Sequence, residues 1–352
     1  MALPTRIGRY PILELLGQGA MGVVYRGRDE SLDRDVAVKV IRGESLDDDS
    51  RAQFLKEARA AARLQHPGIV TVYELGEEEG APFLAMELLE GQDLQRAMRG
   101  GALSDLPRAL AVIDEVLGAL GHAHARGIVH RDMKPSNVFL HLNAQVKILD
   151  FGVARLGEGM TVTGRVVGTP HYMSPEQIRA ERVDGRSDLF STALIFYEMI
   201  TGAKAYRPGS AVTIMYQIVH EDADLSRLPA TPTGEALRTV LRRALARDRD
   251  ARYPDAASFR SALAAAVLRG QAETSVAPPP APERPMLEDV PAPVEDLDFA
   301  YTTPPAAAPP PPMGTGAMAA AIVASALLTG SAIWWWQGRR QPLESPLANA
   351  SI

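Results

Sequence analysis

Apolar residues in the first hundred positions come in short runs, many of them β-branched, and this pattern is typical of strands in a small sheet. The runs at 36–41 and 69–75 show it most clearly. Between them, residues 50–64 have the apolar spacing of a helix. The sequence therefore predicts a small sheet with a single helix over residues 7–99.

Longer helical patterns dominate the residues that follow. Their apolar positions recur every three or four residues over three or more turns. We expect helices at 106–126, 187–201, 233–247 and 256–268. Together with the sheet, these helices predict an α+β fold whose second part is mainly helical.

The composition changes abruptly near residue 270. Residues 271–316 contain seven acidic residues and one arginine, and 13 of the 27 prolines lie within 278–312. Polyproline II structure and charge repulsion keep such a segment extended. We therefore predict a disordered, acidic linker at 271–316, which accounts for the whole formal net charge of −6.

Charge and cysteine content exclude several classes of protein. An acidic chain lacks the basic face that nucleic acid binding requires, so nucleic acid is not an expected partner. Because the chain has no cysteine, it has no disulfide, no thiolate zinc site and no cysteine nucleophile.

Residues 317–336 form a stretch of 20 residues without a charge. A helix of that length spans about 30 Å, the hydrocarbon thickness of a bilayer, so we predict one transmembrane helix there. The alternative is a buried alanine-rich helix, since seven of the 20 residues are alanine. The proline-rich linker leaves such a helix no domain to pack in, whereas the tryptophans at 334–336 suit a membrane interface.

The orientation that we expect for this helix is opposite to the one that the charges next to it favour. Arg339 and Arg340 follow the helix, and positive charges favour the cytoplasmic side. We give more weight to the first 270 residues, because a large folded domain without an export signal is expected to stay in the cytoplasm. The expected location is the cell membrane, with a single pass, a cytoplasmic domain and a short extracytoplasmic tail at 337–352.

Glycines at 17, 19 and 22 give the pattern G-x-G-x-x-G-x-V between two strand-like segments. Glycine lets a backbone fold tightly over phosphates, with N–H groups available to the oxygens. The pattern alone is weak evidence, because it also opens dinucleotide-binding folds and resembles a plain glycine turn. In dinucleotide-binding folds a helix follows, but here a strand-like segment continues at 23–25.

Five further side chains suit phosphate chemistry. Lys39 lies in an apolar strand, where a buried ammonium needs an anion, and Glu57 on the predicted helix is a candidate partner. Asp132 and Asn137 belong to the segment His-Arg-Asp-Met-Lys-Pro-Ser-Asn, and Asp150 opens Asp-Phe-Gly. A carboxylate can activate a hydroxyl, and carboxylate and amide oxygens are ligands that Mg²⁺ prefers.

Taken in order, the motifs make residues 8–268 resemble the protein kinase family. They are the glycine pattern, Val-Ala-Val-Lys at 36–39, the segment at 130–137, Asp-Phe-Gly at 150–152 and Ser-Pro-Glu at 174–176. The resemblance implies a two-lobed protein kinase fold with a small β-rich N-lobe and a larger helical C-lobe. It also implies ATP and Mg²⁺, with Mn²⁺ as an alternative ion, as cofactors.

The resemblance assigns roles to individual residues. Asp132 would accept the proton of the substrate hydroxyl, and Lys39 would hold the α- and β-phosphates and pair with Glu57. Asn137 and Asp150 would bind the metal. The residues expected to contact ATP are Leu16, Gly17, Gln18, Gly19, Ala20, Met21, Gly22, Val23, Val24, Ala37, Lys39, Met86, Glu87, Leu89, Asp93 and Phe139.

Two scaffold contacts are also implied. Asp188, in Asp-Gly-Arg-Ser-Asp, resembles the aspartate that braces the catalytic loop. Glu176 and Arg252 resemble a structural salt bridge of the helical lobe. We expect these residues to support the site rather than to take part in the chemistry.

The substrate class is implied by two residues near the catalytic aspartate. Lys134, two residues after Asp132, resembles the serine/threonine branch, where it steadies the transferred phosphate and meets a threonine corresponding to Thr169. Tyrosine kinases differ at that place. Protein substrates with Ser or Thr acceptors are therefore expected.

Control by autophosphorylation is expected from Arg131 and Arg155. In the family pattern these two arginines form a pocket for a phosphothreonine, and Thr161 and Thr163 are the candidate acceptors. Phosphate there would neutralise both cations and order the loop. The alternative is that these are ordinary loop threonines.

Ser-Pro-Glu-Gln at 174–177, the linker and the single predicted span resemble bacterial eukaryotic-like (Hanks-type) serine/threonine kinases, which implies signal transduction at the membrane. Small residues at 316, 320 and 324 would permit helix pairing and a homodimer. A pseudokinase scaffold is disfavoured because every metal and phosphate residue is present. A small-molecule phosphotransferase is disfavoured by Gly-Thr-Pro at 168–170 and by Ser-Pro-Glu, which serve a protein substrate.

Overall fold

The computed structural model describes residues 3–19, 22–41, 48–100, 105–143, 145–151 and 170–275. Most of the predicted linker and all of residues 317–352 lie outside these ranges. Within them, no helix is both long enough and apolar enough to cross a bilayer. The predicted linker, span and tail therefore stay predictions.

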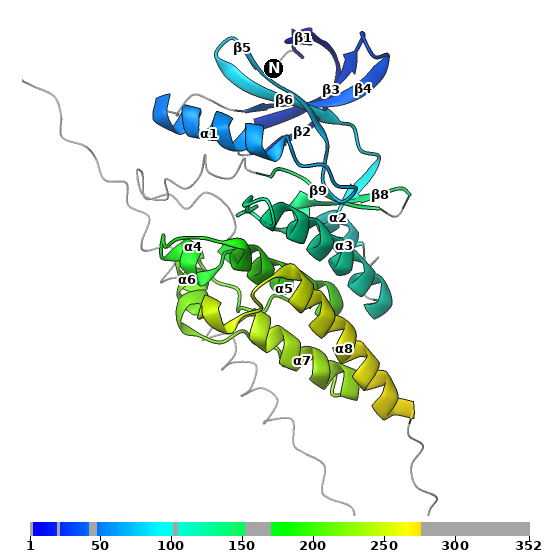
Figure 1. Cartoon of the computed structure of the whole chain (residues 1–352), viewed down its shortest axis with the longest axis vertical. Coiled ribbons are helices and arrows are strands. Elements are labelled where there is room, and N and C mark those ends of the chain that lie inside the picture. The colour runs from blue at the N-terminus through cyan, green and yellow to red at the C-terminus, as the bar shows by residue number, and fades with distance from the viewer. Residues whose placement is uncertain are drawn as a thin grey trace, which may run out of the picture. The chain divides into compact units, whose positions relative to one another are not determined.

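An antiparallel six-stranded sheet builds the N-lobe, with the strand order β1-β2-β3-β4-β6-β5 (Figure 1). Val36, Val38 and Phe83 are buried in an apolar cluster on one face of the sheet. Ala37 and Met86 are buried in a different cluster, because successive strand residues point to opposite faces. The strands are β1 (Arg6–Ile7), β2 (Tyr10–Gly19), β3 (Gly22–Asp29), β4 (Arg34–Ile41), β5 (Val72–Glu78) and β6 (Ala81–Glu87).

One helix, α1 (Asp48–Ala61), belongs to this lobe, as the sequence predicts. Its Ala58 is buried in a cluster with Ile41 and Leu84 of the sheet. The helix ends three residues before the predicted limit at residue 64. Removal of these side chains from water fixes the helix against strands β4 and β6.

A second, three-stranded sheet consists of β7 (Gly91–Asp93), β8 (Val138–His141) and β9 (Val146–Ile148), in that order. Ile69 forms a parallel bridge with Ile148, so the predicted strand at 69–75 is divided between this bridge and β5. Strand β9 ends two residues before Asp150. The bridge therefore connects the segment that follows α1 to the segment that carries a candidate metal ligand.

Helices make up most of the C-lobe, and the four predicted ones are confirmed to within a few residues at most ends. Helix α8 continues seven residues beyond its predicted end, and α6 was not predicted. Helix α6 is only ten residues long and half of its residues are β-branched, a composition that favours strands. The helices are α2 (Leu94–Arg99), α3 (Leu106–His124), α4 (Pro175–Ile178), α5 (Gly185–Thr201), α6 (Ala211–His220), α7 (Pro232–Ala244) and α8 (Ala256–Ser275), with short 3-10 turns η1 (Pro135–Asn137), η3 (Pro170–Tyr172) and η4 (Arg249–Ala251).

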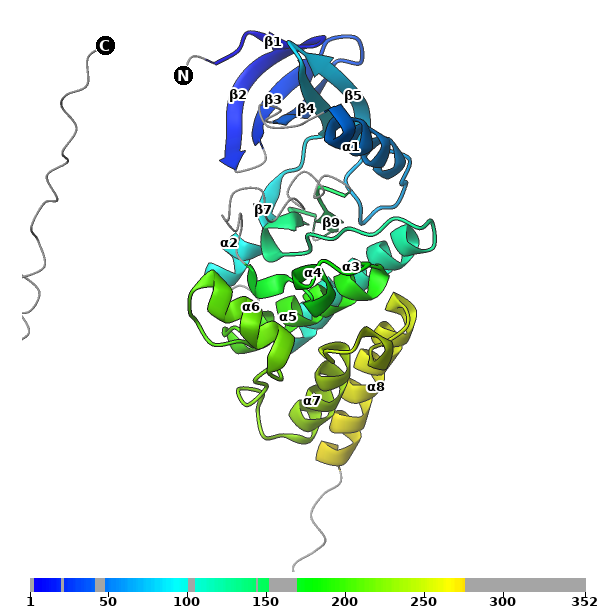
Figure 2. The ribbon, with the colours of Figure 1, turned by 90° about the vertical axis from the view of Figure 1, so that its left-hand side faces the viewer.

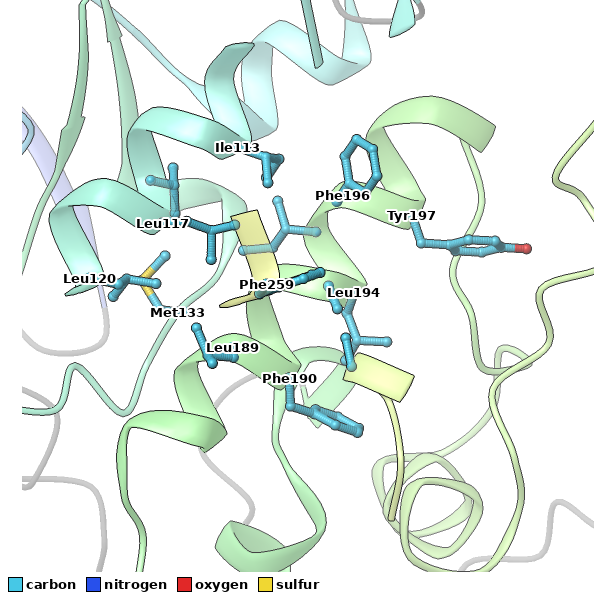
Figure 3. Packing of buried hydrophobic residues seen from close by; sticks show 14 of the residues in the cluster. Ile113, Leu117, Leu120, Met133, Leu189, Phe190, Leu194, Phe196, Tyr197 and Phe259 are labelled. Carbon is cyan, nitrogen blue, oxygen red and sulfur yellow. The ribbon is translucent and has the colours of Figure 1, made fainter. Parts of the chain in front are cut away.

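Helix α5 lies at the centre of this lobe. Its Leu189 and Phe196 belong to one buried cluster with Ile113 and Leu117 of α3 and Phe259 of α8 (Figure 3). Helices α7 and α8 pack against each other beside it (Figure 2). The first turn of α5 is therefore held firmly from several sides, and this turn carries Asp188.

A buried ion pair connects α4 to the segment before α8, as the sequence predicts. Arg252 Nη1 and Nη2 each donate a 2.8 Å hydrogen bond to one carboxylate oxygen of Glu176. The Arg252 side chain is fully buried and that of Glu176 is 3% exposed. Burial acts to raise the pKa of Glu176, but hydrogen bonds and charge from Arg252 outweigh it, so the pKa lies below its usual value.

We expect Arg252→Met to lower the free energy of unfolding by about 3 to 5 kcal/mol, because the Glu176 carboxylate is left buried without its partner. Urea unfolding of the full chain measures this loss. Arg260→Met is the matched control, since its pair with Asp114 is largely exposed and should contribute less than about 1 kcal/mol. An equal fall in the free energy of unfolding in the two variants would show that the buried Glu176–Arg252 pair stabilises the fold no more than the exposed pair does.

Candidate active site

The carboxylate of Asp188 holds the start of the segment from His130 to Asn137. Asp188 is 1% exposed, and its two oxygens accept hydrogen bonds from the backbone amides of His130 and Arg131, each at 2.8 Å. Its Oδ2 also lies 2.8 Å from His124 Nε2. The expected brace is therefore confirmed, and it holds Arg131 at a φ of +68°, in the left-handed region that side chains rarely adopt.

His130 links this segment to the strand before Asp150. Its Nδ1 accepts a hydrogen bond from the amide of Asp132 at 3.2 Å, so Nε2 carries the hydrogen and donates to the carbonyl of Leu149 at 2.7 Å. The buried ring also packs edge-on against Phe151, with ring centroids 4.7 Å apart. His130 and Phe151 act as packing residues that fix the distance between two catalytic segments.

Asp132 is surrounded by hydrogen-bond donors. Lys134 Nζ lies 2.6 Å from Asp132 Oδ2, and Asn137 Nδ2 donates to the same oxygen at 3.1 Å and to the Asp132 carbonyl at 2.7 Å. The turn η1, which begins with Pro135, directs Asn137 back towards Asp132. About a third of the Asp132 and Lys134 side chains is exposed, so both remain accessible to a substrate.

Lys39 forms an ion pair with Asp150. The Lys39 side chain is 8% exposed, and its Nζ lies 2.6 Å from Asp150 Oδ1, which supplies the charge that a buried ammonium requires. Glu57 lies beside Arg131, whose Nη1 donates to its two carboxylate oxygens at 3.4 and 3.5 Å. The Lys39–Glu57 pair implied by the family resemblance stays a prediction.

A cavity of about 700 Å³ brings most of the predicted residues together, a volume within the range of small-molecule sites. Of the predicted ATP contacts, Val23 is not part of its lining, since Val24 beside it points to that side of the strand. The predicted residues that line the cavity are Leu16, Gly17, Gln18, Gly19, Gly22, Val24, Ala37, Lys39, Met86, Glu87, Leu89, Asp93, Arg131, Asp132, Lys134, Asn137, Phe139 and Asp150.

Several predicted residues lie outside the described ranges. They are Ala20, Met21, Arg155, Thr161, Thr163 and Thr169. Their assignment to ATP binding, to the phosphothreonine pocket, to autophosphorylation and to the substrate loop stays a prediction.

Asn137 and Asp150 are suited to hold a divalent metal ion. The amide nitrogen of Asn137 is engaged with Asp132, so its amide oxygen is the group that can face a cation. Asp150 adds a carboxylate, and both are the hard oxygen ligands that Mg²⁺ prefers. Within the described residues, no group of three or more His, Asp or Glu side chains could hold a metal ion.

Residues 10–263 of the chain match the family model of the protein kinase domain. The chain belongs to the protein kinase family. The sheet of the N-lobe and the helical C-lobe fit that family, and the match lies within the predicted domain at 8–268.

Three bacterial kinases show the degree of similarity. A probable serine/threonine-protein kinase of Streptomyces coelicolor is 40% identical over 270 residues, which are 74% of this chain and 40% of that protein. The serine/threonine-protein kinase PknB of Mycolicibacterium smegmatis is 41% identical over 274 residues, or 75% of this chain and 44% of PknB. The serine/threonine-protein kinase pkn3 of Myxococcus xanthus is 37% identical over 271 residues, or 73% of this chain and 50% of pkn3. The chain therefore spans half or less of the length of these relatives.

Gln177 contributes to the kinase site although the sequence analysis did not single it out. Its Nε2 donates to the carbonyl of Arg131 at 2.5 Å, and its Oε1 accepts from the amide of Ser174 at 2.9 Å. The signal was present, because Ser-x-x-Gln is a capping box at the start of α4. The same amide thus caps a helix and fixes the carbonyl of Arg131, the residue before Asp132.

We expect Gln177→Leu to lower the free energy of unfolding by about 1 to 3 kcal/mol, because it leaves polar backbone groups of Arg131 and Ser174 without partners. Urea unfolding measures the loss. Gln177→Glu separates the two contacts, since a carboxylate still accepts from Ser174 but cannot donate to the Arg131 carbonyl. A Gln177→Leu variant as stable as the unmutated chain would contradict the assignment.

Proposed function

We propose that the chain is an ATP-dependent serine/threonine protein kinase that transfers the γ-phosphoryl group to Ser and Thr hydroxyls of proteins. The observation that carries the proposal is the cluster of Asp132, Lys134 and Asn137 on the wall of the cavity that Lys39 and Asp150 also line. A general base, phosphate-binding cations and metal ligands in one cavity are the parts that phosphoryl transfer requires. The names of the bacterial relatives support the Ser/Thr assignment.

In this proposal, Asp132 orients the attacking hydroxyl and accepts its proton. Lys134, 2.6 Å from Asp132 Oδ2, is placed to hold the transferred phosphate beside that hydroxyl. Lys39 holds the α- and β-phosphates. Magnesium, held by Asn137 and Asp150, would neutralise the charge of the phosphate oxygens. The protein thus works mainly by positioning and charge compensation.

The apolar part of the cavity suits an adenine ring. Val24, Ala37 and Met86 belong to one apolar cluster, and Phe139 lines the same cavity. The Glu87 amide donates to the carbonyl of Thr71 at 2.9 Å, so Glu87 would meet the adenine through its own carbonyl. The backbone of Leu89 and the side chain of Asp93 would complete the contacts to adenine and ribose.

The proposal includes activation by autophosphorylation at Thr161 or Thr163. What supports it is Arg131, whose Nε is buried and has no hydrogen-bond partner among the described residues. Phosphate would offer that atom an acceptor, with Arg155 as a second cation. Mass-spectrometric mapping of phosphate on the purified chain after incubation with ATP tests this part, and a phosphorylated chain with neither threonine modified would contradict it.

We also propose signalling at the cell membrane, with the kinase domain cytoplasmic and one helix at 317–336 as the anchor. The uncharged 20-residue stretch and the flanking tryptophans support it. Close approach of small residues would favour a homodimer there. Protease protection in sealed vesicles tests the orientation, and a protected N-terminal domain in inside-out vesicles would contradict it.

We expect Asp132→Asn to lower the rate of phosphate transfer to a generic protein substrate by about 10² to 10⁴-fold, because the variant cannot accept the hydroxyl proton. Transfer of labelled phosphate from ATP with Mg²⁺ measures the rate. Asp114→Asn, on the exposed side of α3, is the matched control and should keep full activity.

Two outcomes would overturn the proposal. An unmutated chain that binds nucleotide without transferring phosphate would favour the pseudokinase scaffold. Transfer to a small molecule and not to protein would favour the phosphotransferase alternative.

A further inference from the structure

Two charged side chains that the proposed mechanism does not use meet beside the nucleotide cavity. Lys147 Nζ, on β9, lies 2.6 Å from Oε1 of Glu87, at the end of β6. Their side chains are only 12% and 20% exposed. Removing one partner of a pair so shielded from water leaves the other with a poorly hydrated charge, which costs more than breaking a surface pair.

The Glu87 carboxylate also binds a third segment. Its Oε1 accepts a hydrogen bond from the amide of Thr71 at 3.2 Å, while the Glu87 amide donates to the Thr71 carbonyl at 2.9 Å. The residues before Thr71 are in turn attached to β9, because Val70 donates to Ile148 and Ile148 donates to Gly68. Glu87 and Lys147 therefore close a connection between the end of β6, the segment at 68–71 and β9.

Lys147 also lies opposite a residue of the cavity. It is the cross-strand partner of Phe139 in β8, and directly opposed residues share one face of a sheet. Phe139 lines the cavity, whereas Lys147 does not. Three residues after Lys147 comes Asp150, the candidate metal ligand. The ammonium is therefore not placed as a phosphate ligand; it connects Glu87, which lines the cavity, to the strand that leads to Asp150.

We propose that Lys147 is a positioning residue for ATP, which acts by holding Glu87 and so the hinge backbone at residues 87–89 in register with Phe139 and Asp150. This inference rests on the proposed function of the same site. Without the ion pair, the hinge groups that receive adenine lose their fixed distance from the groups that hold the phosphates. The affinity for nucleotide should fall. The segment at 130–137, which Asp188 holds separately, should keep its geometry.

Lys147→Met tests the inference, because methionine keeps an unbranched apolar side chain and removes the charge. In the full chain we expect the KM for ATP, and the Kd of a non-hydrolysable ATP analogue, to rise about tenfold, the size expected for loss of a charged hydrogen bond. We expect kcat to stay within about twofold. Lys147→Arg should restore most of the affinity, since it keeps the cation.

Two further variants make the result specific. Lys56→Met is the matched control, because Lys56 is an exposed lysine on α1 and should leave KM and Kd unchanged. Glu87→Gln should weaken nucleotide binding by itself, and the double variant with Lys147→Met should bind no more weakly than the weaker single variant. If Lys147→Met does not fold, Lys147→Arg and Glu87→Gln provide the same comparison.

An unchanged Kd in Lys147→Met, or a fall in kcat at an unchanged KM, would overturn the inference. Simple addition of the two single effects in the double variant would also overturn it. The analogue-binding measurement needs no phosphate transfer. If the unmutated chain binds nucleotide but transfers no phosphate, the proposed function fails, while the role of Lys147 in binding is still decided.

Discussion

The buried carboxylate of Asp188 is the constraint on which the rest of the site depends. It lies in the first turn of α5, the most enclosed helix of the C-lobe, and it accepts from two consecutive backbone amides. This contact holds Arg131 at a positive φ, a backbone conformation that is unfavourable for a residue other than glycine unless the surrounding structure stabilises it. His130 then carries the same constraint to Leu149, and so to Asp150, while Asp132 follows directly in the chain. Asp132 and Asp150, the proposed general base and metal ligand, are thus positioned from one side chain in the core.

Charges around the cavity are arranged in pairs. Lys39 with Asp150, Lys134 with Asp132, Arg131 with Glu57 and Lys147 with Glu87 each join a cation to a carboxylate. Pairing lets these groups lie partly out of water, where their interactions with phosphate are stronger than at a free surface. In the proposed function, three of the pairs face reacting groups or a regulatory phosphate. The fourth joins hinge and β9, and it is the one assigned a purely positioning role.

Much of this could be read from the sequence. The β-branched runs and the helical periods predicted the sheet and four long helices, because these features depend on neighbours in the chain. Most of the cavity lining was implied by the family resemblance that the ordered motifs carry. Helix α6 was missed because it is short and half of its residues are β-branched, a composition that favours strands. The ion pairs of Lys39 with Asp150, of Arg131 with Glu57 and of Glu87 with Lys147 were not predicted, since several groups of opposite charge were available and only the fold decides which is near. Gln177 was missed although its capping box was visible, because its second contact, to Arg131, is distant in the chain.

The central proposal is that Asp188 positions the segment at 130–137 independently of nucleotide binding. The most direct measurement compares Asp188→Asn with the unmutated chain for nucleotide affinity and for the rate of phosphate transfer. Asparagine keeps the size but cannot accept from both amides with its two terminal atoms, and displacement of about 1 Å can cost about a hundredfold in rate. We predict a transfer rate lowered about a hundredfold or more with nucleotide affinity within about threefold. An unchanged rate, or a parallel loss of affinity and rate, would contradict the account.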